Sequence, residues 1–179
     1  MSEAPLAIIT HGWASSPNWF WIRDTKQQLE KAGYRTLTPH MPRTRHPNLE
    51  EWEAKLADVA VGSPDVTIIA DSCSGRSGLS YTQKHPVRNL IVIASLVGDL
   101  GQDDFIESLW RDFYSKHLDK EAIKRNCSNI IGLYSEDDDV IPYNQADLFE
   151  LTLGKVLRFS DQGHFRNKSL PVDLTQYLI

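Results

Sequence analysis

The chain of 179 residues has few cysteines, no long apolar run and no excess of basic residues. Its two cysteines, Cys73 and Cys127, offer neither a disulfide framework nor metal-ligand spacing, which is typical of a reducing compartment. The first apolar run, residues 6–9, is too short for a signal-peptide core or a membrane span. The net charge of −5, without a basic tract, argues against nucleic acid as a partner. We therefore expect a cytoplasmic protein that binds neither nucleic acid nor a membrane.

Short apolar runs alternate with amphipathic segments along the whole chain. Strands are expected at residues 6–10, 35–38, 66–69, 90–94, 130–134 and 155–159, with helices between them. Such alternation requires a parallel sheet that is covered by helices on both faces. No repeat, linker or low-complexity tract divides the chain, and its length suits one core. The prediction is an α/β protein with three layers, a single domain over residues 1–179, and a doubly wound, mainly parallel sheet of about six strands.

The first helix is expected to begin at Ser16-Pro17, where a serine N-cap precedes proline, and to stop at Gly33. Four aromatic residues lie at or near its start: Trp13, Trp19, Phe20 and Trp21. We expect most of these rings to pack in the core or against the helix, although one could wall a substrate pocket. Residues 39–47 carry four basic or imidazole side chains, for which a solvated loop is favoured over a contact with an acidic substrate group.

The stretch around Ser72 passes from a buried strand through a turn of small residues into a helix. This is how a nucleophile elbow is built, with small residues two positions before and two positions after the nucleophile. Ser72 as the nucleophile puts Ala70 and Ser74 at these positions, whereas Cys73 would put Asp71 at the first of them. Ser72 is favoured because an aspartate fits a close approach of strand and helix much less well than an alanine does.

Four loops that follow expected strands carry the parts of acyl-transfer chemistry. Ser72 lies on the elbow, and Gly12 follows the first strand. The acidic run 136–139 follows the last strand but one, and His164 follows the last strand. In a parallel sheet these loops open on the same edge, where ligands bind. The chain order of serine, acid and histidine is that of α/β-hydrolases.

Each part has a role in acyl transfer. A serine hydroxyl needs a base, for which His164 is the candidate, and a carboxylate must hold the imidazole in the correct tautomer. The backbone N–H groups of Cys73 and Trp13 are candidates for the oxyanion hole. The chemistry alone leaves open which acid of residues 136–139 meets the histidine. A metal loop is a weaker alternative, because the spacing fits no EF-hand and lacks its glycine, so neither a metal nor a cofactor is expected.

With these residues in place, the chain resembles the small cap-less serine hydrolases of the retinoblastoma-binding-protein-nine and YdeN-like family. The resemblance rests on His11-Gly12, Met41-Pro42, Ser72, Asp99-Leu100-Gly101, Asn126-Cys127, the acidic loop that ends in Pro142, and Gly163-His164-Phe165. It implies a minimal three-layer α/β-hydrolase fold without a separate cap domain. In that family the second acid of an Asp-Asp pair, four residues before a proline, orients the histidine.

Placed on this sequence, the resemblance implies Asp138 as the acid and Ser72 as the nucleophile. The family elbow usually reads Gly-His-Ser-x-Gly, and this chain departs from it at three positions: Ala70, Asp71 and Ser74. Without a cap, the pocket is left to the loops, and the candidate substrate-binding residues are His11, Gly12, Met41 and Trp110.

The predicted function is that of a serine hydrolase that cleaves a small ester, thioester or amide through an acyl-enzyme, with a small molecule as its partner. Two alternatives remain open at this point. The altered elbow is compatible with a binding module that kept the fold and lost turnover. The same site is also compatible with a non-hydrolytic reaction such as acyl transfer or a lyase step.

Overall fold

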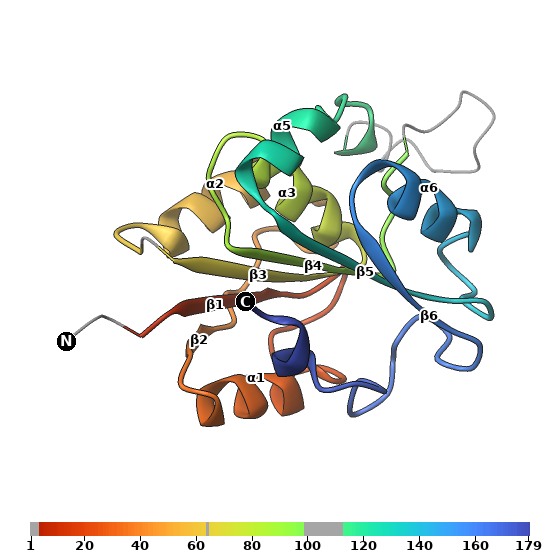
Figure 1. Ribbon diagram of the computed structural model, residues 1–179, viewed down its shortest axis with the longest axis horizontal. Coiled ribbons are helices and arrows are strands. Elements are labelled where there is room, and N and C mark those ends of the chain that lie inside the picture. The colour runs from red at the N-terminus through yellow and green to blue at the C-terminus, as the bar shows by residue number, and fades with distance from the viewer. Residues whose placement is uncertain (1–3, 64, 99–112) are drawn as a thin grey trace.

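The computed structural model describes residues 4–63, 65–98 and 113–179 (Figure 1). The elements in chain order are β1 (Leu6–Thr10), α1 (Ile22–Lys31), β2 (Arg35–Leu37), α2 (Leu49–Ala60), β3 (Val66–Asp71), α3 (Cys73–Thr82), β4 (Asn89–Ile93), α5 (Lys120–Asn126), β5 (Asn129–Ser135), α6 (Asn144–Thr152), β6 (Lys155–Phe159) and the 3₁₀ helix η1 (Leu174–Tyr177). Within these described ranges, no helix is long and apolar enough to cross a membrane.

The six strands form one sheet in the order β2-β1-β3-β4-β5-β6, and every neighbouring pair is parallel. All residues of β1, β3 and β4 are buried, whereas β2 and β6 at the two edges are partly exposed. Central strands of a parallel sheet are apolar on both faces because helices cover both. The prediction of a doubly wound parallel sheet is confirmed.

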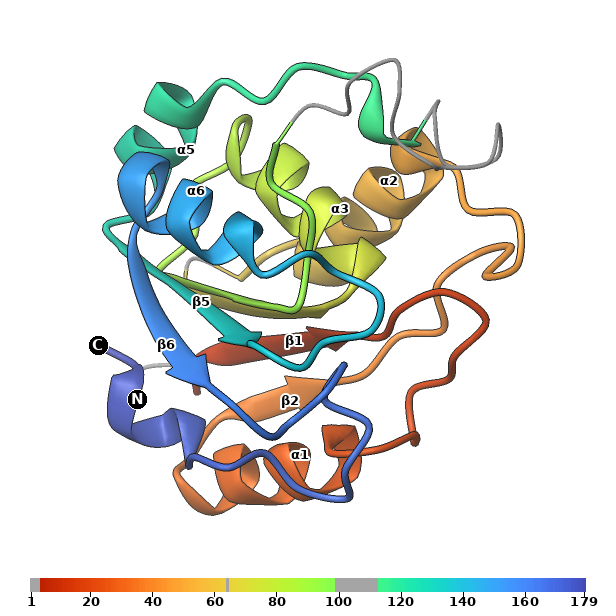
Figure 2. The ribbon, with the colours of Figure 1, turned by 90° about the vertical axis from the view of Figure 1, so that its right-hand side faces the viewer.

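Helices lie on both faces of the sheet. Figures 1 and 2 show α2, α3, α5 and α6 together on one face, with α1 and the C-terminal η1 on the other. Helix α3 contacts β3, from which it directly follows, and it also packs against α2 and α5. The turn between β3 and α3 is therefore held between the sheet and the larger helical layer.

The start of the first helix was predicted wrongly. Helix α1 begins at Ile22, and Ser16-Pro17 belongs to a series of turns before it. Phe20 has a φ of +52°, a left-handed conformation that a helix cannot contain. Because of this turn, Trp21 is buried while Trp19 and Phe20 remain exposed.

Two predictions lie outside the described residues. They are the loop at residues 99–101, which contributed to the family resemblance, and the candidate substrate contact Trp110.

Candidate active site

Ser72 occupies a strained turn at the carboxyl edge of the sheet. It is the one residue between β3 and α3, with φ of 53° and ψ of −126°. An L-residue adopts such a conformation only when its surroundings enforce it, and such strain is common at functional sites. One contact that holds this conformation is a hydrogen bond of 2.8 Å from the Ser72 backbone N–H to the carbonyl of Ile93 in β4. This geometry is that of a nucleophile elbow.

Gly12 and Gly75 lie where the backbone packs closely against residues around the Ser72 turn. A Cβ added to Gly12, in the loop after β1, would lie 3.0 Å from the Cβ of Ser72. A Cβ added to Gly75 would lie 2.5 Å from both the Cβ and the Oγ of Ser95. Real Cβ atoms essentially never approach as closely as at Gly75, so α3 depends on glycine there, whereas at Gly12 the contact would be tight and the neighbouring side chain would have to shift slightly.

Ala70 and Ser74 stand where the family pattern has glycine, and the structure accommodates both side chains. Ala70 packs against α3 at Gly78, where a Cβ added to the glycine would lie 3.3 Å from that of Ala70. Ser74 is fully buried, and its hydroxyl donates to the carbonyl of Asp71 at 2.8 Å and accepts from the hydroxyl of Thr10 at 2.9 Å. The serine therefore occupies this position with its hydrogen bonds satisfied.

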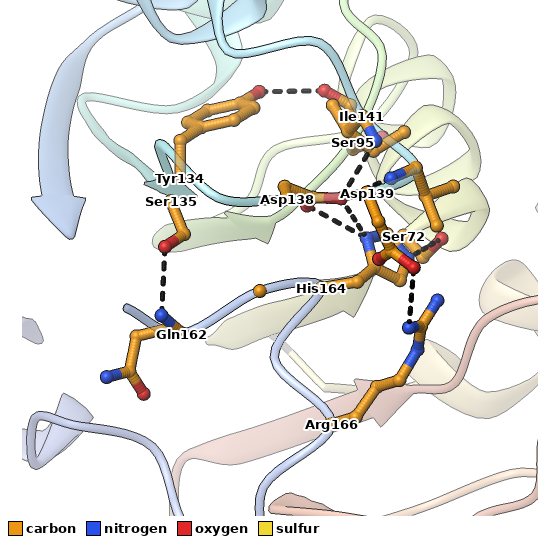
Figure 3. A network of polar contacts seen from close by, with 12 residues as sticks. Ser72, Ser95, Tyr134, Ser135, Asp138, Asp139, Ile141, Gln162, His164 and Arg166 are labelled. Carbon is orange, nitrogen blue, oxygen red and sulfur yellow. Dashed lines mark hydrogen bonds and ion pairs between the residues drawn. The ribbon is translucent and has the colours of Figure 1, made fainter. Parts of the chain in front are cut away.

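Three side chains from separate loops form one chain of hydrogen bonds (Figure 3). The Nε2 atom of His164 lies 2.9 Å from the Oγ of Ser72. On the other side of the ring, Nδ1 lies 2.9 Å and 3.1 Å from the two carboxylate oxygens of Asp138. When Nδ1 carries the ring proton and donates a hydrogen bond to the carboxylate, the lone pair of Nε2 accepts a hydrogen bond from the serine hydroxyl.

The loop after β5 holds the Asp138 carboxylate in place. Only 2% of its side chain is exposed. Its Oδ1 accepts hydrogen bonds from the backbone N–H groups of Val140 and Ile141, at 2.8 and 2.9 Å. Two backbone donors and the imidazole thus fix the orientation of the carboxylate.

The neighbouring acids of this loop point elsewhere. Asp137 accepts from the hydroxyl of Ser135 at 2.6 Å and from the N–H of Gly163 at 2.8 Å, and these bonds lower its pKa. Asp139 pairs with Arg166 at 3.1 Å, which lowers its pKa as well. The choice among four adjacent acids, which chemistry alone left open, is thus made by local hydrogen bonding.

Asp71, immediately before Ser72, carries a second carboxyl group into the site. Its side chain is buried at the floor of the pocket. Burial raises its pKa to about 7, against the opposing effects of His164 and of the backbone N–H of Gly12. The nearby Arg166 also favours the ionised form. The guanidinium of Arg76, in the first turn of α3, donates to the carbonyls of Tyr114 and Lys116.

Cys73 follows Ser72 and begins α3. Burial raises the pKa of its thiol, and the charge of Asp71 acts in the same direction. The backbone N–H groups of Trp13 and of Cys73 itself oppose this rise by hydrogen bonding to the sulfur. A protonated thiol is a weak nucleophile, which favours Ser72 over its neighbour. The two N–H groups named from the sequence for an oxyanion hole therefore lie beside the same sulfur atom.

A pocket of about 610 Å³ opens above Ser72. Its wall is mostly apolar, with Trp13, Trp19 and Phe20 on the loop after β1 and Val140 on the loop after β5, all four of them exposed. The rest of its lining consists of Gly12, Ala14, Ser15, Asp71, Ser72, Cys73, Leu96, Tyr114, Ile141, His164 and Arg166. The expectation that most of the aromatic rings near the first helix pack in the core or against that helix is therefore wrong, because Trp21 is buried whereas Trp13, Trp19 and Phe20 stay exposed and line the pocket.

Two predicted substrate contacts lie elsewhere. His11 is fully buried, Met41 is nearly so, and neither lines the pocket. The Nε2 of His11 accepts a hydrogen bond of 3.2 Å from the backbone N–H of Met41, and burial lowers the pKa of this histidine. The imidazole is therefore neutral and ties the loop after β1 to the loop after β2, in support of the residues that line the pocket.

A serine elbow on a parallel sheet, followed in the chain by an acid and a histidine, defines the class of α/β-hydrolases. The family model described as serine hydrolase matches residues 7–170. The chain accordingly belongs to this serine hydrolase family, of which RBBP9 and YdeN are representatives, as the sequence predicted.

Individual relatives agree with this assignment. Serine hydrolase RBBP9 of Rattus norvegicus is 28% identical over 162 residues, which are 89% of this chain and 81% of the rat protein. The ydeN gene product of B. subtilis has the same fold, with a TM-score of 0.83 and 20% identity over 97% of this chain and 98% of that one. Est1E from Butyrivibrio proteoclasticus superposes with a TM-score of 0.72 and 15% identity, over 92% and 81% of the two chains. The α/β-hydrolase fold is thereby confirmed, in a small form.

Proposed function

We propose that the protein is a carboxylesterase-like serine hydrolase that cleaves a small ester, thioester or amide through an acyl-enzyme on Ser72. The observation that carries this proposal is the hydrogen-bonded chain from Ser72 through His164 to Asp138, at the floor of an open pocket. The strained backbone of Ser72 adds support, because it holds the hydroxyl clear of the sheet.

In the proposed first step, the Ser72 oxygen attacks the carbonyl carbon of the substrate while His164 takes the hydroxyl proton. The tetrahedral intermediate collapses as the imidazolium returns that proton to the leaving group, which departs as an alcohol, thiol or amine. A water molecule then attacks the acyl-enzyme, with His164 again acting as the base, and the acid is released from Ser72.

Asp138 orients the imidazole and stabilises its protonated form, for which its two backbone hydrogen bonds make it well suited. The N–H groups of Trp13 and Cys73 are proposed to bind the developing oxyanion, since both lie beside the elbow. Loss of one such donor typically lowers kcat about 10²- to 10³-fold.

The apolar wall of the pocket favours a substrate with an apolar or aromatic group next to the carbonyl. Trp13, Trp19 and Phe20 are between 39% and 49% exposed as residues. Such rings bind an apolar group by removing both surfaces from water. A structure of Est1E with ferulic acid bound has the same fold, which is in keeping with an aromatic acyl group.

Hydrolysis of p-nitrophenyl butyrate tests this proposal. Native protein should release one equivalent of p-nitrophenol in a burst if deacylation is the slower step, followed by steady turnover. His164→Asn should abolish both phases, because no base then remains at the Ser72 oxygen. Hydrolysis that is independent of His164 would refute the mechanism.

One observation favours a second candidate, a binding module without turnover. Asp71 stands where relatives usually have histidine, and its charge would oppose an oxyanion formed nearby. Under this alternative, native protein would retain ligands in the pocket of about 610 Å³ and show no hydrolysis above that of Ser72→Ala.

A further inference from the structure

A second pocket, of about 540 Å³, adjoins the one above Ser72. The two share Phe20 and Arg166 in their walls. The other lining residues come from the loop before α1, from α1 itself and from the loop after β6: Asn18, Arg23, Asp24, Gln27 and Lys168. A ligand that extends past Phe20 and Arg166 would therefore reach from the Ser72 pocket into this second pocket, which we name the basic pocket.

The basic pocket carries an excess of positive charge on a chain whose net charge is −5. Three cationic side chains line it, Arg23, Arg166 and Lys168, against the single carboxylate of Asp24. That carboxylate already accepts a hydrogen bond of 3.0 Å from Gln28. The composition of the chain does not explain this local excess, so it points to an anion as the ligand.

Two of the cations are available to a ligand. In the part of the chain that the structure describes, no carboxylate lies within ion-pair distance of Arg23 or Lys168, and both are exposed. Arg166 pairs with Asp139 at 3.1 Å, yet half of its side chain remains accessible. Arginine and lysine donors of this kind are the usual partners of phosphate groups.

Arg166 connects the two pockets electrostatically as well as in space. It lies two residues after His164, and its charge acts on the buried carboxyl of Asp71 beside Ser72. An anionic group bound in the basic pocket would thus lie beside the reaction site, close enough to belong to the same substrate molecule whose carbonyl Ser72 attacks.

We propose that the basic pocket binds a phosphate group of the substrate, and that the substrate is an ester or thioester with an apolar acyl group and a phosphate-bearing leaving group. This inference rests on the proposed function and specifies its substrate class. The apolar wall above Ser72 takes the acyl group, and Arg23, Arg166 and Lys168 take the phosphate.

Two thioesters with the same acyl group test the proposal: butyryl-coenzyme A and the N-acetylcysteamine thioester of butyrate, which has the same thioester bond and no phosphate. Native protein should hydrolyse the phosphorylated substrate with the higher kcat/KM. In the double variant Arg23→Gln/Lys168→Gln, the ratio of the two kcat/KM values should fall at least about tenfold, because two charged contacts to phosphate are lost. Lys31→Gln, an exposed lysine at the other end of the same helix, is the matched control and should keep the native ratio.

A binding measurement separates failure of this inference from failure of the hydrolase proposal. Calorimetry of Ser72→Ala with butyryl-coenzyme A should show binding that is at least about tenfold weaker after the two basic side chains are removed. Equal binding and equal kcat/KM ratios in the double variant would overturn the inference while leaving hydrolysis intact. Binding of inorganic phosphate without a preference for the phosphorylated thioester would overturn it too, because the anion would then be a separate ligand. Absence of hydrolysis with both thioesters, despite charge-dependent binding, would contradict the proposed function alone.

Discussion

Replacement of Asp71 by asparagine should stabilise the protein, and increasingly so as the pH rises. The pKa of this buried carboxyl is raised from 3.8 to about 7 in the folded state. Between these values the folded protein binds more protons than the unfolded chain, so stability falls as the pH rises from about 4 to about 7. A shift of about three pKa units corresponds to about 4 kcal/mol, at about 1.4 kcal/mol for each unit. Asparagine has nearly the same shape and no charge, and its carbonyl oxygen can still accept from the Gly12 N–H.

Urea unfolding of both proteins at a series of pH values measures this difference. The free energies of unfolding should nearly coincide at pH 4 and diverge steadily up to about pH 7, with the variant the more stable by roughly 4 kcal/mol above that pH. Asp139→Asn is a control of opposite sign, because Arg166 lowers the pKa of Asp139 and the native pair stabilises the protein at neutral pH. Parallel curves for native protein and Asp71→Asn would refute the view that burial dominates at Asp71.

Three further substitutions test the geometry of the site. Asp138→Asn should lower kcat about 10⁴-fold with little effect on folding, because His164 loses the partner that sets its tautomer; a smaller loss than tenfold would contradict that role. Gly75→Ala should cost at least about 1–3 kcal/mol in unfolding free energy, since its Cβ would meet Ser95 at 2.5 Å; an unchanged urea midpoint would show that α3 can move. Tyr134→Phe should cost about 1 kcal/mol, because its buried hydroxyl donates to the carbonyl of Ser95 at 2.9 Å, and thermal unfolding would detect the difference.

The order of elements and the parallel sheet were predictable because burial on both faces requires strands that are apolar almost without interruption. Residues 66–69 and 90–94 show this pattern directly, and both segments became central strands. The positions of Ser72, Asp138 and His164 followed from the same topology together with the family resemblance, because loops after parallel strands meet at one edge. Their geometry agrees with the roles proposed for them.

Other features depend on tertiary contacts that no local pattern reveals. Ser16-Pro17 resembles a helix start, but the left-handed backbone at Phe20 moves the start of α1 to Ile22. The exposed aromatic side chains before Ile22 therefore lie around the pocket and not on the helix. His11 follows β1 as expected of a ligand contact, yet whether such a loop residue faces inward or outward depends on the neighbouring loop that carries Met41. The adjoining basic pocket joins Arg23 to Lys168, which are far apart in the sequence.

The central claim is that Ser72 is the nucleophile, and labelling with a fluorophosphonate probe tests it most directly. Mass spectrometry of the digested protein should find the probe on Ser72 in native protein and in Cys73→Ala, and on neither residue in Ser72→Ala. His164→Asn should react far more slowly, since the hydroxyl lacks its base at 2.9 Å. A label that persists in Ser72→Ala and disappears in Cys73→Ala would contradict the account.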